Sequence, residues 1–252
     1  DWINEAAAPA LLYDLAQAIP ELEVLVVNQQ ISQGGINSPR VIEGLNALAR
    51  KNPHCTFLVD SRDLCTKFQG MVLKLNAVEA AGFCGEQRAV NRAIALEDVE
   101  HYMKQIQTTT RQPVYVTRGN RGLAVFDGKE FVYEPGIHIL KRTDPVGAGD
   151  TIASALAASL SAGASLTESA TFANLAAFVT VQKLKQTGTA SPAEIITAGA
   201  DIDYIFRPEH AEDIRRATYL EGSRIEIINP GIERGDIRHV VFDHDGTIST
   251  LR

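Results

Sequence analysis

The stretch Asp144-Pro-Val-Gly-Ala-Gly-Asp-Thr151 restricts the fold of this 252-residue sequence more than any other. A run of small and apolar residues, typical of a buried helix, follows it from Ile152 to Leu160. Gly147 and Gly149 permit a tight turn and a close approach of the backbone to a ligand. Because the first amide groups of a helix lack internal partners and lie at its positive dipole end, the turn is predicted to bind an anion.

Asp150 adds a carboxylate to the first turn of this predicted helix. A base beside a bound phosphate is what phosphoryl transfer to a hydroxyl requires. A purely structural interpretation is also open, because Gly-rich turns between strands and helices are common and Asp is a favourable first-turn residue.

The motif resembles a known family. From Asp144 through Ala157 the sequence is similar at every position to the C-terminal signature of the ribokinase-like (PfkB) carbohydrate kinases. The resemblance implies that Asp150 deprotonates the sugar hydroxyl and that the N–H groups of Gly147, Ala148 and Gly149 form an anion hole. It also implies ATP and Mg as cofactors, with a sugar or sugar phosphate as the small-molecule substrate.

The segments around the motif alternate between apolar runs and helical patterns. Strands are predicted at 23–27, 55–59, 72–75 and 112–117, and helices at 4–19, 41–50, 96–107, 149–162 and 166–184. This order predicts an α/β fold, a ribokinase-like parallel sheet flanked by helices. Ligands of such sheets bind beyond the carboxyl ends of the strands, where Asn28, Asp60 and Asn76 are expected.

Asn76-Ala-Val-Glu79 follows the third predicted strand and has the spacing of a helix capping box. It also resembles the family's Asn-x-x-Glu motif, which implies that Asn76 and Glu79 order the surroundings of magnesium and phosphate indirectly. The two interpretations are compatible, because one side chain can cap a helix and contact a ligand shell through water.

Residues 117–122 (Thr-Arg-Gly-Asn-Arg-Gly) predict a hairpin loop and also resemble the family's Thr-x-Gly-x-x-Gly loop, which lies against the nucleotide. Arg118 and Arg121 are candidate phosphate contacts. The resemblance implies a nucleotide site made by five residues, Thr117, Gly119, Asn174, Gly188 and Thr189.

The resemblance covers only the C-terminal portion of such a kinase, so that domain is assigned to 1–200, with its N-terminal part absent from the sequence. The missing portion would supply most sugar contacts and a lid, so this fragment by itself is a candidate for an inactive piece. The family also implies a possible homodimer.

Residues 201–222 are charged and are interpreted as a linker, and 223–252 as the first strands of a second α/β domain. The apolar run Arg238-His-Val-Val-Phe242 leads into Asp243-His-Asp-Gly-Thr247, which resembles the first motif of haloacid dehalogenase-like phosphatases. In that motif Asp243 is the nucleophile, Asp245 the acid/base, and both hold magnesium.

Composition narrows the functional classes. The net charge of −7 and the absence of basic runs argue against nucleic-acid binding, and no apolar run is long enough to span a membrane. Three cysteines without a Cys-x-x-Cys pair predict reduced thiols and a cytoplasmic protein. The sequence therefore predicts an ATP-dependent kinase for a sugar or sugar phosphate within a bifunctional kinase/phosphatase. The alternatives are a non-catalytic nucleotide or sugar-phosphate module regulating a fused phosphatase, or a phosphatase whose nucleophile is Asp243.

Overall fold

A computed structural model describes residues 6–31, 35–89, 93–137, 139 and 142–200, together with the backbone of 218–219 and 226–227. A six-stranded sheet with the order β1-β2-β3-β4-β5-β6 forms its centre. The strands are β1 Val24–Gln29, β2 Thr56–Ser61, β3 Val72–Asn76, β4 Val114–Thr117, β5 Leu123–Phe126 and β6 Phe131–Glu134.

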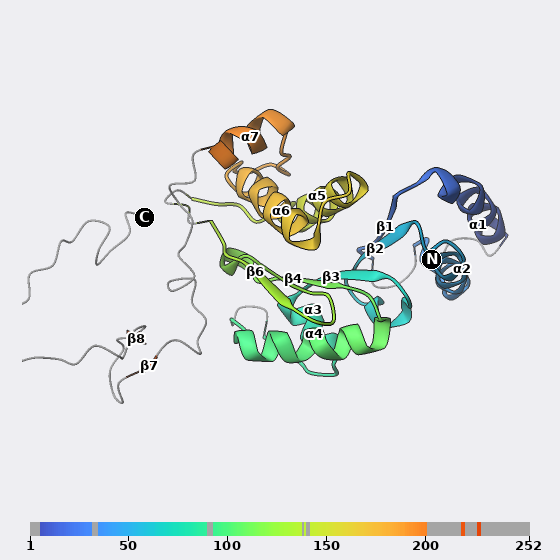
Figure 1. Cartoon of the computed structure of the whole chain (residues 1–252), viewed down its shortest axis with the longest axis horizontal. Helices are drawn as coiled ribbons and strands as arrows, with labels where there is room; N and C mark the ends of the chain where they lie inside the picture. The colour runs from blue at the N-terminus through green and yellow to red at the C-terminus, as the bar shows by residue number, and fades with distance from the viewer. Residues whose placement is uncertain are drawn as a thin grey trace, which may run out of the picture.

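The helices lie on both faces of this sheet (Figure 1). They are α1 Ala7–Ala18, α2 Pro39–Lys51, α3 Ala77–Phe83, α4 Leu96–Thr110, α5 Ala148–Ser161, α6 Leu166–Val181 and α7 Pro192–Ala200. Three short 3-10 turns lie in the connections: η1 Ile19–Glu21 between α1 and β1, η2 Cys65–Lys67 between β2 and β3, and η3 Gly119–Arg121 between β4 and β5. Among the described residues, no helix is both long and apolar enough to cross a membrane.

Four of the six strands form the predicted parallel sheet, β1 to β4. β5 and β6 extend it in the antiparallel direction, because the short loop after β4 closes a hairpin, as the interpretation of residues 117–126 predicts. The result is a mixed α/β sheet that keeps the predicted layer architecture.

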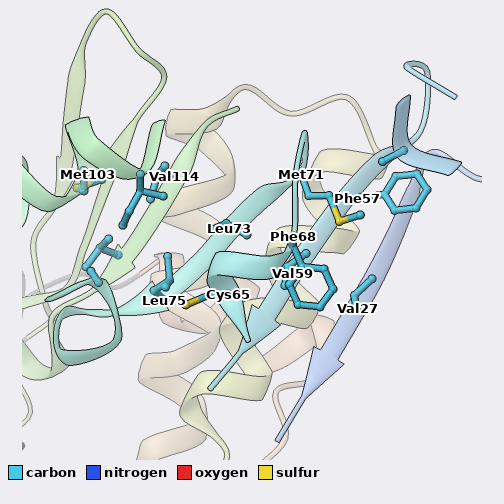
Figure 2. Packing of buried hydrophobic residues seen from close by; sticks show 14 of the residues in the cluster. Val27, Phe57, Val59, Cys65, Phe68, Met71, Leu73, Leu75, Met103 and Val114 are labelled. Carbon is cyan, nitrogen blue, oxygen red and sulfur yellow. The ribbon is translucent and has the colours of Figure 1, made fainter. Parts of the chain in front are cut away.

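Alternate side chains of each strand enter different apolar clusters, as the two-residue period of a strand requires. Leu73 and Leu75 of β3 join the cluster on the α3 and α4 face, where Figure 2 shows them with Phe57 and Val59 of β2. Val72 belongs instead to the cluster beneath α5 and α6. Side chains at even-numbered positions of β2 and β3 therefore face α5.

The predicted strand ends are short by up to two residues. β1 and β2 pair in register through Gln29 and Ser61, so Asn28 and Asp60 lie within the strands rather than just after them. Beyond residue 200 the structure describes one antiparallel pair, β7 Thr218–Tyr219 with β8 Glu226–Ile227. β7 lies inside the segment 201–222 that was interpreted as a linker, and Asp243 and Asp245 lie outside the described residues.

A substitution at Gly122 can test the packing of the hairpin. Its φ is +84°, and a Cβ there would lie 2.1 Å from the Glu134 carbonyl oxygen. Gly163 has nearly the same φ, +82°, with nothing within 4 Å of its Cβ position. We expect Gly163→Ala to cost about 1–2 kcal/mol of unfolding free energy, for the left-handed conformation alone.

Gly122→Ala should cost more than this comparison variant by about 1–3 kcal/mol, because the ψ of Gly122, −138°, lies near a region that only glycine favours and because the backbone must also move. Urea unfolding of both variants measures the difference. Equal losses in the two variants would show that the close approach of the hairpin to residues 134–136 is wrong.

Candidate active site

The motif that opens the sequence analysis forms the turn before α5. Gly147 is the N-cap residue of α5 and has a φ of +83°, a conformation that favours glycine, and its carbonyl accepts the Thr151 N–H at 2.9 Å. The Ala148 N–H donates to the Pro145 carbonyl at 3.1 Å, so it already has an acceptor inside the turn. The predicted turn and helix start are thus both present, with Asp150 in the first helical turn.

Asp144 fixes this turn to the chain that follows α6. One carboxylate oxygen accepts the Val146 N–H and the other the Lys185 N–H, each at 3.1 Å. The Asp144 N–H donates to the Val181 carbonyl at 2.7 Å. The first Asp of the motif therefore has a structural role, holding the two loops together through both carboxylate oxygens.

The predicted purine turn lies against the predicted anion turn. A Cβ added to Gly147 would lie 3.4 Å from the Gly188 carbonyl oxygen. The Thr189 carbonyl accepts the Lys183 ammonium at 2.5 Å, and that ammonium also pairs with Glu194 at 2.7 Å. Neither Gly188 nor Thr189 lines the two pockets described below.

A pocket of about 560 Å³ lies beside the α5 N-terminus. Its walls bring together residues from four separate parts of the chain, among them Thr117, Gly119, Ala148, Gly149, Asn174 and Phe178. Three of the five predicted nucleotide-site residues therefore share one pocket with the predicted anion turn. This is the arrangement expected if the base and sugar of a nucleotide occupy the pocket and its phosphates point to α5.

Asn174 is buried in α6, and its amide donates to the Pro135 carbonyl at 2.7 Å. It thereby holds the chain that leaves β6 at the rim of the pocket. Next to it, the Glu134 carboxylate accepts the Thr171 hydroxyl at 2.9 Å, and burial raises the pKa of Glu134. Asn174 satisfies its polar group within the fold, as a buried amide must.

A second pocket, of about 1080 Å³, adjoins the first across the loop after β4. Asn76, Glu79 and Arg118 line the second pocket, and Gly119 and Arg121 line both. The predicted metal-side pair and the predicted nucleotide loop therefore lie next to each other.

The capping box at the start of α3 is confirmed. The Asn76 side-chain oxygen accepts the Val78 and Glu79 N–H groups at 2.9 Å, and the Glu79 carboxylate accepts the Asn76 N–H at 2.7 Å. Burial raises the pKa of Glu79, and the Asn76 N–H and the Lys74 ammonium oppose that shift.

The oxygen atoms of Asn76 and Glu79 suit a magnesium ion that keeps its water ligands. No group of three or more His, Cys, Asp or Glu side chains in the described part of the chain is arranged to hold a metal. Mg²⁺ needs few protein ligands, because it is usually bound by one or two carboxylates together with waters and substrate phosphates. Glu79 fits such a role, since only one of its carboxylate oxygens is used by the cap.

Polar side chains replace apolar ones where the strands end beneath α5. On the face of Leu58 and Val72, the next residues in the two-residue period are Asp60 and Lys74. Asn28 occupies the matching position of β1, opposite Asp60 in the register. The Asn28 amide donates to the Asp150 carboxylate at 3.5 Å, which joins the sheet edge to the first turn of α5.

Sequence reasoning missed Lys74. Its ammonium donates to the Asp60 carboxylate at 2.7 Å, and both side chains are buried, with relative exposures of 6% and 7%. Burial raises the pKa of the Asp60 carboxyl, the Lys74 ammonium opposes this, and Asp150 adds to it. The signal was a single Lys inside the apolar run Val72-Leu-Lys-Leu75, which is costly to bury without a partner.

The sequence and the fold of this chain resemble those of known proteins. The model of the pfkB family of carbohydrate kinases matches residues 4–194. The bifunctional protein HldE of Yersinia enterocolitica is 32% identical over 194 residues, which cover 73% of this chain and 37% of that protein. HldE of Enterobacter sp. (strain 638) is 33% identical over 249 residues, covering 94% of this chain and 47% of that protein.

Among solved structures, phosphofructokinase-2 from Escherichia coli in complex with potassium aligns with a TM-score of 0.63 and 20% identity, covering 79% of this chain and 63% of that one. Ribokinase from Giardia lamblia aligns with a TM-score of 0.62 and 21% identity, over 76% and 63% of the two chains. These two likenesses show the fold, and the chain spans less than half the length of the two HldE relatives. By its sequence match and its fold, this chain belongs to the pfkB family of carbohydrate kinases.

Proposed function

We propose that this chain carries the phosphoryl-transfer site of a kinase that uses ATP to phosphorylate a hydroxyl of a sugar or sugar phosphate. The observation that carries the proposal is the position of Asp150 in the first turn of α5, beside the pocket that Thr117, Gly119 and Asn174 line. Family membership supports the same class of reaction. The similarity to bifunctional HldE proteins supports a place in a protein with a second activity.

In the proposed reaction Asp150 accepts the proton of the attacking hydroxyl. The hydroxyl oxygen then forms a bond to the γ-phosphorus, while the bond from that phosphorus to the bridging oxygen of ADP breaks. Negative charge on the transferred group is stabilised by the N–H groups of the α5 N-terminus, at Gly147, Ala148 and Gly149. Since the Ala148 N–H already has an acceptor, its contribution requires a bifurcated hydrogen bond or a small change in the turn.

The remaining site residues have supporting roles in this proposal. Thr117, Gly119 and Asn174 form the nucleotide pocket, and Gly188 and Thr189 belong to a turn that packs against the anion turn at Gly147 without lining that pocket. Asn76 and Glu79, which line the second pocket, would hold the water ligands of a magnesium ion bound together with the ATP phosphates. Magnesium, when bound, would offset phosphate charge.

Asp150→Asn tests the base. Asn has the same size but accepts no proton, so kcat should fall by about 10²- to 10⁴-fold while nucleotide affinity changes little. ADP release, measured in the full-length protein against a panel of sugars and sugar phosphates, gives both parameters. The matched control is Asp14→Asn, on the exposed side of α1, which should keep wild-type turnover.

Near wild-type turnover in the Asp150→Asn variant would refute the assignment of the base. Nucleotide binding without phosphorylation of any tested sugar in the wild-type protein would instead favour a non-catalytic regulatory module.

A phosphatase activity is the second candidate, and the motif Asp243-His-Asp-Gly-Thr247 is what favours it. We propose that residues 1–200 are the kinase domain, 201–222 the connection, and 223–252 the start of a haloacid dehalogenase-like domain. In that domain Asp243 attacks phosphorus, Asp245 protonates the leaving oxygen, and both hold magnesium.

Asp243→Asn in the full-length protein should abolish phosphate release from an aryl phosphate and leave sugar phosphorylation unchanged. Asp236→Asn, seven residues earlier in the same segment, is the control and should retain phosphate release. Phosphate release that survives Asp243→Asn would exclude Asp243 as the nucleophile.

A further inference from the structure

We propose that Lys74 is a further catalytic residue, whose ammonium binds the phosphoryl group during its transfer, and that Asp60 is the residue that positions it. This inference rests on the proposed kinase function. It goes beyond that function by placing a side-chain cation in the site, where the roles above used only backbone N–H groups and Asp150.

The Lys74 side chain lies on the same face of the sheet as α5. Lys74 lies opposite Asp60 in the register of two neighbouring parallel strands, so both point to the face of the sheet beneath α5. A Cβ added to Gly149 would lie 3.3 Å from the Lys74 ammonium nitrogen. The ammonium is therefore next to the backbone of the predicted anion turn.

Residue 149, next to the Lys74 ammonium, is a glycine. Its φ is not among the positive values of the chain, so its backbone conformation does not itself require glycine. A side chain there would press on the Lys74 nitrogen at a distance tighter than most Cβ contacts. Gly147 is thus favoured by its conformation, whereas a side chain at 149 would require the Lys74 ammonium to shift by a few tenths of an ångström.

The charges at the N-terminus of α5 also bear on the role of Lys74. The N-terminus of α5 is the positive end of a 14-residue helix, and a cation is unfavourable there. The Lys74 ammonium and this helix end lie next to each other, and an anion between them would interact favourably with both, while the Asp60 and Asp150 carboxylates nearby offset part of this positive charge. Among the described residues, Asp60 is the acceptor of the one hydrogen bond that the ammonium makes, although an ammonium has three donors.

The alternative is that the buried pair of Lys74 and Asp60 has a purely structural role. A buried ion pair is weak evidence for stability, because apolar residues of similar volume in its place are often neutral or stabilising. The rest of this face of the sheet is already apolar at Leu58, Val72 and Tyr115. Apolar residues could therefore fill this place, whereas phosphoryl transfer benefits from a fixed cation.

In the transfer step Lys74 stays protonated throughout. The proton of the hydroxyl goes to Asp150, and ADP leaves with the electron pair of the broken P–O bond. Lys74 contributes by contact with the phosphoryl oxygens, and the Asp60 carboxylate holds its flexible side chain in place at 2.7 Å.

The test uses the double variant Lys74→Met/Asp60→Leu in the full-length protein. This variant removes both charges together, so it leaves no unpaired buried ion and should be at least as stable to urea as the wild type. The exposed Lys51→Met is the matched control. Calorimetry measures the affinities for ADP and for a non-hydrolysable ATP analogue, and ADP release measures kcat.

If the proposal holds, the double variant binds ADP like the wild type, binds the ATP analogue about tenfold or more weakly, and loses about 10²-fold in kcat. Unchanged analogue affinity and kcat in a folded double variant would overturn the role of Lys74 alone. A wild-type protein that binds neither nucleotide would overturn the proposed kinase function, and the role of Lys74 with it.

Discussion

The two-residue alternation of side chains along β1, β2 and β3 determines where the polar groups of the site lie. The face that packs beneath α5 and α6 is apolar through Leu58 and Val72, and becomes charged at Asp60 and Lys74. A shift of β2 or β3 by one residue would send the charge on that strand, Asp60 or Lys74, into the opposite apolar cluster and separate the pair. The parallel register is thus the constraint on which the site depends, since it also sets where the N-terminus of α5 meets the sheet.

Much of this arrangement could be predicted, because several signals in the sequence are local. Gly147 indicates a left-handed residue before a helix. Asn76 and Glu79 indicate a capping box. Neither prediction requires knowledge of distant residues. The layer order followed from the spacing of apolar runs. The predicted ends of β1 and β2 were two residues too early, so Asn28 and Asp60 were expected after the strands. Polar residues resemble the start of a loop, and only the pairing with a neighbouring strand shows that the strand continues.

What could not be predicted depends on contacts between distant segments. Lys74 is hidden in an apolar run, and its partner, 14 residues earlier, is brought to it only by the register of β2 and β3. Asn174 lines the first pocket, yet its hydrogen bond to the Pro135 carbonyl could not be predicted, because it requires the chain after β6 to lie against α6. The roles proposed for Asp243 and Asp245 depend on the motif alone, since those residues lie outside the described part of the chain.

The buried pair of Asp60 and Lys74 also has a consequence for how this protein can evolve. Loss of either residue alone leaves a buried charge without its partner, which typically costs about 3–5 kcal/mol, a large part of the stability of most domains. Replacement of both together carries no such penalty. Positions 60 and 74 are therefore expected to covary among relatives, and lineages that lack both charges would mark a change in how the phosphoryl group is held.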